Sequence, residues 1–168
     1  VASKASDNGF HSVLRSDDEG VTWEEMYNQE YGNLLGWSSQ ADDAGGQGWY
    51  DLAIAVSPLS PDEVYIGGVN VWKTSDGGLS WLIAGHWYGD NAPYVHADQH
   101  TLAFNPLTNE LYSGNDGGIY RTGDGGSSWE DLSDGVSILQ IYRISSSYTN
   151  TQRVIGGCQD NGTMLREG

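Results

Sequence analysis

The chain reads SDDEGVTW at residues 16–23, TSDGGLSW at 74–81 and TGDGGSSW at 122–129. All three stretches follow the pattern Ser/Thr-x-Asp-x-Gly-x-Ser/Thr-Trp. Asp and Ser/Thr side chains hydrogen-bond within their own turn, and Gly adopts positive φ without a steric clash. A Trp after such a turn is typical of a strand that packs against a neighbour. We therefore predict three equivalent hairpin turns, called the Asp turns below.

The Asp turns need no ligand to explain them, because turn chemistry accounts for every shared position. The alternative is calcium binding, but the spacing lacks the alternating oxygen ligands and the closing Glu of a helix–loop–helix calcium loop. We therefore expect structural roles for the shared residues, which are Ser16, Asp18, Gly20, Thr22, Trp23, Thr74, Asp76, Gly78, Ser80, Trp81, Thr122, Asp124, Gly126, Ser128 and Trp129.

The similarity extends upstream of the second and third Asp turns, with matching stretches 47 or 48 residues apart. AVSP precedes VYIGG and VWKT in one unit, and AFNP precedes LYSG and IYRT in the next. Short runs rich in Val, Ile and Tyr between Gly, Pro and Asn clusters indicate strands. We predict strands A to D at 51–56, 63–67, 71–74 and from 81 in one unit, and at 101–104, 110–114, 119–122 and from 129 in the next.

Four short strands repeated at just under 50 residues are typical of a β-propeller blade. We predict an all-β fold of about three to four four-stranded blades, with the Asp turns between strands C and D. Because propellers usually close with more blades, we expect the chain to be part of one larger propeller that includes further blades of the same polypeptide. The expected segments are a partial blade at 1–30, a loop at 31–50, a blade at 50–83, a loop at 84–98, a blade at 99–133 and a partial blade at 138–168.

Composition excludes several classes of function. The chain has 7 Lys and Arg against 23 Asp and Glu, a formal net charge of −16. This argues against nucleic acid as a partner, because phosphate binding needs cationic side chains. No apolar run is long enough to span a bilayer, so we expect no membrane insertion. The single cysteine, Cys158, excludes an internal disulfide, and 7 Trp with 10 Tyr argue against disorder.

The Asp turns resemble the Asp-box (BNR) repeat of sialidase, sortilin-like and xyloglucanase-type β-propellers. The stretches QGWYDLAIAVSP at 47–58, HADQH at 96–100, GNDGGIY at 114–120 and QDNGT at 159–163 are similar to large secreted bacterial Asp-box proteins. The resemblance implies a propeller and an extracellular or cell-surface location. It does not decide the activity, because enzymes and non-enzymes share this repeat.

Propeller topology predicts which face carries function. In a four-stranded blade, the A–B and C–D turns lie at one end, and the B–C turns and the inter-blade connections lie at the other. Long connections on a rigid scaffold are where binding residues concentrate. The candidate ligand-binding residues on the face opposite the Asp turns are Trp49, Tyr50, His96, Asp98, His100, Asn115, Asp116, Gln159, Asp160 and Asn161. Trp37, Trp87, Tyr88 and Tyr94 lie in or beside the same connections and, like Trp49 and Tyr50, could stack on sugar rings or cover the blade ends.

His96, Asp98 and His100 alternate along the chain, and in an extended strand all three would lie on one side. Imidazole and carboxylate are common ligands of zinc and other transition metals. One hypothesis is therefore a metal ion at these residues. The alternative is a group in which the carboxylate orients the histidines; we expect no other cofactor.

Asp116 and Asp160 occupy matching B–C turns of successive units. Two carboxylates that face one cleft could catalyse glycoside hydrolysis, whereas Asn-Asp-Gly-Gly and Asp-Asn-Gly are also ordinary turn sequences. The chain lacks the arginine cluster of sialidases. The sequence therefore favours a non-catalytic recognition or scaffold propeller that binds glycan or protein, with a glycoside hydrolase as the alternative.

Overall fold

The residues that the structure describes fold into four antiparallel sheets of three or four strands, the all-β, β-propeller fold that the sequence predicts. The computed structural model describes residues 1–136 and 139–167, so residues 138 and 168, which bound the expected last partial blade, lie outside the described residues. The chain divides into two units, Val1–Leu132 and Ser133–Gly168, each described here by itself. Among the described residues, no helix is long and apolar enough to cross a membrane.

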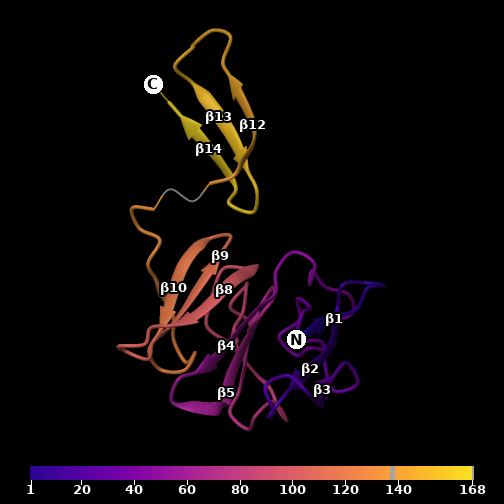
Figure 1. Ribbon diagram of the computed structural model, residues 1–168. Helices are drawn as coiled ribbons and strands as arrows, with labels where there is room; N and C mark the ends of the chain where they lie inside the picture. The colour runs from indigo at the N-terminus through magenta and orange to yellow at the C-terminus, as the bar shows by residue number, and fades with distance from the viewer. Residues whose placement is uncertain (137–138, 168) are drawn as a thin grey trace. The chain divides into compact units, whose positions relative to one another are not determined.

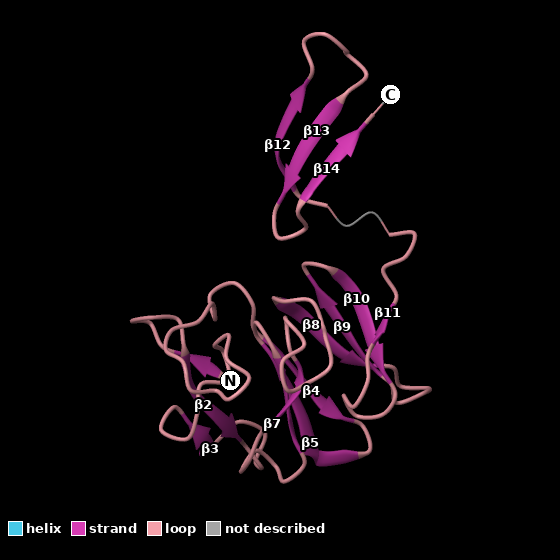
Figure 2. Cartoon of the chain, turned by 180° about the vertical axis from the view of Figure 1, so that it is seen from behind, coloured by secondary structure: helices cyan, strands magenta, loops and turns pink. Residues whose placement is uncertain are grey.

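The first unit contains three sheets, and in each of them the strands follow one another in chain order. Figures 1 and 2 show the second sheet between the other two. The first sheet is β1 (Ala2–Ser3), β2 (Phe10–Arg15) and β3 (Glu24–Asn28). The second is β4 (Ala53–Ser57), β5 (Ser60–Gly67), β6 (Val71–Thr74) and β7 (Leu82–Gly85). The third is β8 (Gln99–Phe104), β9 (Leu111–Asn115), β10 (Gly118–Thr122) and β11 (Glu130–Asp131).

These bounds confirm the four strands predicted for each of the two complete repeats. Seven of the eight strands begin within two residues of the predicted start, and the fourth strand begins one residue after the Trp, at Leu82 and Glu130. Strand β5 begins at Ser60, three residues before its predicted start. The second unit is a single sheet of β12 (Ile141–Ser146), β13 (Val154–Cys158) and β14 (Thr163–Arg166), with β13 in the middle.

Two apolar clusters hold the first unit together, one on each face of the second sheet. Tyr65 and Ile66 are consecutive on β5 and therefore point to opposite faces. Tyr65 joins Leu111 of the third sheet in one cluster, and Ile66 joins Phe10 of the first sheet in the other. Each of these four side chains is at most 1% exposed, so the second sheet is buried on both faces.

Each Asp turn closes through the hydrogen bonds of its own side chains. In the second turn, the Thr74 hydroxyl donates to Asp76 Oδ1 at 2.7 Å and accepts from the Gly78 N–H at 3.1 Å. Ser80 donates its N–H to Oδ1 of Asp76 at 3.0 Å and its hydroxyl to Oδ2 at 2.6 Å. Gly78 has a φ of 103°, which explains the glycine at this position.

The same pattern recurs in the first and third turns around Asp18 and Asp124. Hydrogen bonds from hydroxyl and N–H groups lower the pKa of all three Asp side chains, that of Asp18 to about 2. The carboxylates are therefore charged throughout the neutral range, and their contacts serve the turns.

The Trp residues of the Asp turns differ in their packing. Trp81 and Trp129 pack against the two apolar clusters, as the sequence suggested. The indole N–H of Trp129 donates to Ala84 O of the neighbouring sheet at 2.8 Å. Trp23 is 62% exposed, contrary to expectation, because the first sheet has no preceding sheet in the described chain to cover it.

Candidate functional site

The end of the sheets opposite the Asp turns gathers the β5–β6 and β9–β10 turns and two long connections. Antiparallel strands in chain order place successive turns at alternate ends. The connections run from 29 to 52, between β3 and β4, and from 86 to 98, between β7 and β8. We call this end of the first unit the loop face.

Asp116, in the β9–β10 turn, joins two sequence-predicted residues. Tyr50 donates its hydroxyl to Oδ2 of Asp116 at 2.9 Å, and His100 Nε2 lies 2.7 Å from Oδ1. The rings of Tyr50 and His100 meet edge to face, with centroids 4.9 Å apart. Because a carboxylate only accepts hydrogen bonds, the geometry assigns the proton to Nε2 of His100. Trp49, which is 72% exposed, packs against Tyr50 at the rim.

Behind this group lies a buried carboxyl pair, Asp51 and Asp98, with exposed fractions of 1% and 7%. Gln47 Nε2 donates to Asp98 Oδ1 at 2.6 Å and lies 3.5 Å from Asp51 Oδ2. Burial raises the pKa of Asp51 to about 8, and the neighbouring Asp98 carboxylate, which also hydrogen-bonds it, adds to the rise. The pair therefore holds a proton at neutral pH, because two adjacent buried carboxylates do not both ionise readily.

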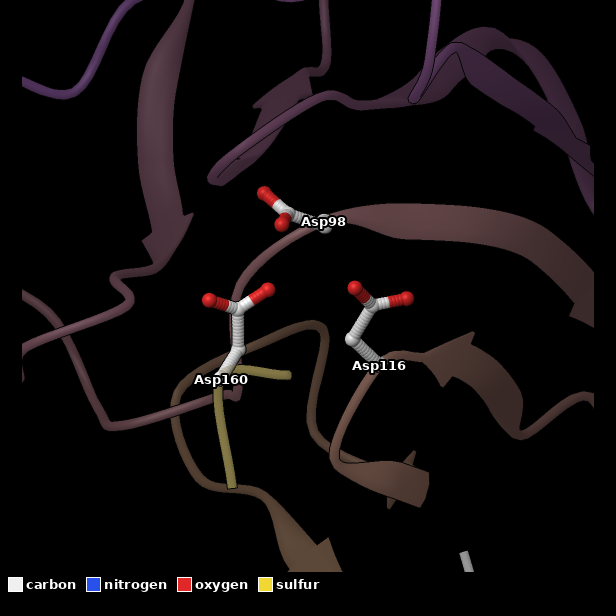
Figure 3. A group of neighbouring side chains, drawn as sticks. All are labelled: Asp98, Asp116 and Asp160. Carbon is white, nitrogen blue, oxygen red and sulfur yellow. The ribbon is translucent and has the colours of Figure 1, made fainter. Parts of the chain in front are cut away.

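Asp98 connects the buried pair to Asp116. A carboxylate oxygen of Asp98 lies within 4.8 Å of one of Asp116, and Figure 3 shows the two side chains, at the start of β8 and in the β9–β10 turn. The φ of Asp98 is 67°, a left-handed conformation that is uncommon outside glycine. Strained backbone of this kind clusters at functional sites, and it marks Asp98 as the candidate centre of this one.

His96 and Asn115 lie beside this centre and have neighbours of their own. The His96 ring packs on Gly117, where an added Cβ would lie 2.2 Å from its Cγ. Gln99, fully buried, donates to the His96 carbonyl at 2.6 Å. Asn115 is 8% exposed and accepts the Gly117 N–H at 3.1 Å. The Asn115 amide thus holds the β9–β10 turn in place.

The His-x-Asp-x-His spacing does not produce the expected row of side chains. Strand β8 begins at Gln99, and the positive φ of Asp98 breaks the alternation that an extended chain would give. His100 bonds to Asp116, Asp98 bonds to Gln47, and His96 packs on Gly117. A metal ion at the three residues is thus a hypothesis that rests on their sequence pattern.

The remaining sequence-predicted residues belong to the second unit. Gln159, Asp160 and Asn161 form the β13–β14 turn, in which the Asn161 side chain donates to the Gln159 carbonyl at 3.1 Å. Asp160 is exposed and has a φ of 52°. Asp116 and Asp160 therefore occupy equivalent turns, but in different units.

A second feature of the loop face is a groove of about 450 Å³ between the two long connections. Trp37, Trp87 and Tyr88 line it and are 42%, 39% and 78% exposed. The other lining residues are polar: Ser38, Ser39, Gln40, His86 and Asp90. The groove therefore combines exposed aromatic rings with hydroxyl, amide and carboxylate groups, and includes no Lys or Arg.

The Trp37 carbonyl fixes the groove by accepting three side-chain hydrogen bonds. They come from Asn70 Nδ2 at 3.3 Å, His86 Nε2 at 3.1 Å and Trp87 Nε1 at 3.2 Å. His86, 5% exposed, accepts the N–H of Asp90 at its other ring nitrogen, at 3.0 Å. The backbone of the first connection and the Trp87 indole are thus tied together before any ligand binds.

The sequence analysis missed Gln47, Asp51, His86 and Asp90 as site residues. One feature of the sequence could have indicated Asp51. It is a charged residue at the start of an apolar strand that the repeat places in the interior of the sheet. The roles of His86 and Asp90 had none, because they depend on contacts between two connections that are far apart in sequence.

No protein-family model matches the chain, and no curated protein matches it. The solved structures that are similar to it include YCF48 bound to D1 peptide (12% identity, TM-score 0.45), an ancestral GH74 enzyme (18%, 0.49) and the GH74 xyloglucanase from Xanthomonas campestris (17%, 0.51). They are matched over 92%, 96% and 94% of this chain but only 44%, 20% and 24% of their own. At this identity, the similarity to the xyloglucanase shows the β-propeller fold alone.

Proposed function

We propose that the first unit is part of a non-catalytic recognition propeller of a secreted or cell-surface protein, and that its loop face binds a glycan. The groove at Trp37, Trp87 and Tyr88 is the observation that carries this proposal. Its volume lies in the range of small-ligand sites, and its exposed rings can stack on the apolar faces of sugar rings. Ser38, Gln40 and Asp90 offer donors and acceptors for sugar hydroxyls.

The lining favours a neutral glycan over an anionic ligand, because Asp90 is the charged residue that faces the groove and no Lys or Arg joins it. A peptide partner is the competing possibility. Carbohydrate binding by stacking gains from preorganised rings, and the hydrogen bond from the Trp87 indole to the Trp37 carbonyl orders one of the three rings.

The test measures binding of chain 1–168 to cellohexaose, mannohexaose and soluble xyloglucan by affinity electrophoresis and Trp fluorescence. Trp87→Ala should weaken binding at least tenfold. Trp23→Ala is the matched control, because Trp23 is an exposed Trp on an Asp turn at the opposite end. Equal effects of the two substitutions, or binding of peptides but none of the glycans, would refute the proposal.

A glycoside hydrolase is the second candidate, favoured by Asp98, which is hydrogen-bonded to the protonated Asp51 and has a carboxylate oxygen within 4.8 Å of one of Asp116. An acid that keeps its proton beside a carboxylate matches the needs of glycoside hydrolysis. Against it, both Asp116 oxygens accept hydrogen bonds from Tyr50 and His100. The test measures the release of reducing ends from xyloglucan. If Asp116→Asn abolishes this release and retains binding, the protein is a glycoside hydrolase and the recognition proposal is wrong.

A further inference from the structure

His86 holds the groove together through both nitrogens of its ring. The residue is 5% exposed and lies where β7 passes into the connection 86–98. Nδ1 lies 3.2 Å from the backbone nitrogen of Tyr88 and 3.0 Å from that of Asp90. Nε2 lies 3.1 Å from the carbonyl oxygen of Trp37, on the other connection. One buried imidazole therefore bonds to its own turn and to the opposite side of the groove.

These contacts fix the position of the proton on the His86 ring. A backbone N–H only donates and a carbonyl oxygen only accepts, so Nδ1 is the bare acceptor and Nε2 carries the hydrogen. A proton added to Nδ1 would point at two N–H groups and would leave all three donors without an acceptor. The protonated imidazole and the closed turn therefore exclude each other.

The aromatic residues of the groove depend on His86 to different degrees. Nδ1 holds the backbone of Tyr88 and Asp90, and Oδ2 of Asp90 in turn accepts the hydroxyl of Ser39 at 2.7 Å. Trp87 has a separate partner, because its N–H donates to Oδ1 of Asn70 at 3.1 Å. Loss of the acceptor at Nδ1 would thus release Tyr88 and Asp90 and leave Trp87 in place.

The charges around His86 do not prevent its protonation. The segments that bond to this residue or line the groove with it carry the titratable side chains Tyr88, Asp90, Tyr94, Asp42 and Asp43, and Asn70 from the β5–β6 turn is uncharged. None of these side chains is a cation. Protonation is opposed instead by the burial of the ring and by the two N–H groups at Nδ1, and opening of the turn relieves both.

We propose that His86 is a pH switch for the groove, and that its protonation in mild acid releases Tyr88 and Asp90 and weakens glycan binding. Because the same groove is the proposed glycan site, the switch rests on the proposed function. Histidine is the side chain that ordinarily changes its charge between about pH 5 and 8. The groove is therefore closed and able to bind at pH 7.5, and it opens as the pH falls.

The first measurement is the affinity of chain 1–168 for cellohexaose, mannohexaose and soluble xyloglucan at pH 7.5, 6.5 and 5.5. The affinity should be about tenfold lower at pH 5.5 than at pH 7.5. Global unfolding does not explain such a loss, because the proton on Asp51, with a pKa of about 8, favours the folded state as the pH falls. Equal affinity at the three pH values would overturn the switch, whereas no binding at pH 7.5 would refute the proposed function.

Two substitutions in the groove locate the effect. Tyr88→Ala should weaken binding at pH 7.5 and have little effect at pH 5.5, where the turn has already released this ring. Trp87→Ala is the matched control and should weaken binding by the same factor at both pH values, because Asn70 still holds its backbone. The same pH dependence in both variants would contradict a local opening at Tyr88.

His86→Asn removes the titrating ring and keeps an acceptor near the position of Nδ1. Asn28 and Asn105 already accept the N–H two residues ahead, each at 2.9 Å. The affinity of this variant should not change between pH 7.5 and 5.5. His11→Asn, at an exposed histidine on β2, is the control and should keep the wild-type dependence.

Hydrogen exchange of the wild-type chain tests the switch without a ligand. Relative to intrinsic exchange rates, the amides of Tyr88 and Asp90 should be protected at pH 7.5 and lose this protection at pH 5.5. The amide of Trp87 should stay protected at both pH values. Protection of all three amides at pH 5.5, or loss of all three together, would overturn the proposal even if His86→Asn does not fold or no glycan binds.

Discussion

The carboxyl groups of Asp51 and Asp98 are hydrogen-bonded to each other in the interior of the first unit, where both side chains are at least nine-tenths buried. One residue precedes β4 and the other precedes β8, so the pair joins the starts of two neighbouring inner strands. A shared proton at this point ties the stability of the loop face to pH.

Replacing Asp51 by Asn should flatten the dependence of stability on pH. With a pKa of about 8 in the folded state, Asp51 binds a proton that the unfolded chain releases above about pH 4. The free energy of unfolding should therefore fall as the pH rises from about 4 to 8, by up to about 1 kcal/mol per pH unit.

Urea denaturation of the wild type and of Asp51→Asn at pH 5, 6, 7 and 8 measures this slope. The free energy of unfolding of the variant should rise relative to that of the wild type as the pH rises. Asp134→Asn is the control at an exposed Asp, and its free energy of unfolding should change with pH as that of the wild type does. An unchanged slope in Asp51→Asn would show that the pair does not hold the proton.

Replacing Trp129 by Ala should destabilise the first unit by about 3 kcal/mol, because the indole packs in the cluster between the second and third sheets and bonds Ala84 O. Trp23→Ala should cost about 1 kcal/mol or less, since that ring is 62% exposed. Chemical denaturation of both variants makes the comparison. Similar losses would mean that the turn, rather than the packing, needs the Trp.

Replacing Gly126 by Ala should cost about 2 kcal/mol or more, from a positive φ and an overpacked contact. Gly126 has a φ of 87°, and its Cβ would lie 2.7 Å from that of Ala84. Gly135→Ala is the matched control, with a φ of 80° and no atom within 4 Å of its Cβ. The difference between the melting-temperature shifts of the two variants measures the effect of the contact between residue 126 and Ala84. Equal shifts would argue against close packing at Gly126.

Replacing Tyr50 by Phe should destabilise the first unit by about 1 kcal/mol, because it removes the hydroxyl that donates to Asp116 and keeps the ring against His100. Tyr88→Phe, at a tyrosine that is 78% exposed, should have no effect. Thermal unfolding at neutral pH compares them. An unchanged melting temperature in Tyr50→Phe would show that a hydrogen bond from water to Asp116 stabilises the fold equally well.

The second and third sheets could be predicted from the sequence, because the repeat marks each of their strands twice. Strand bounds agree within two residues at the starts of β4 and β8, since Ala55 and Ala103 occupy the same place in both units. The repeat does not predict the burial of Trp23. Its Asp turn matches that of Trp81 in sequence, but burial of the ring depends on a neighbouring sheet.

The site was harder to predict than the fold. Tyr50, His100 and Asp116 were named from their place on one face, and the structure brings them together. The buried partner Asp51 was not predicted as a site residue, because the repeat assigns it to a strand and gives no information on its ionisation. The left-handed Asp98 shows why the alternation of histidines failed, since one backbone angle redirects the side chains on either side of it.

The self-contained bonding of the Asp turns also bears on how such a chain could evolve. Each turn is closed by residues within a single octapeptide, so DNA recombination between two of these sites would insert or delete a whole sheet and leave an intact hairpin at the junction. Copies made in this way could then diverge at the opposite end, where the two long connections follow no repeated pattern.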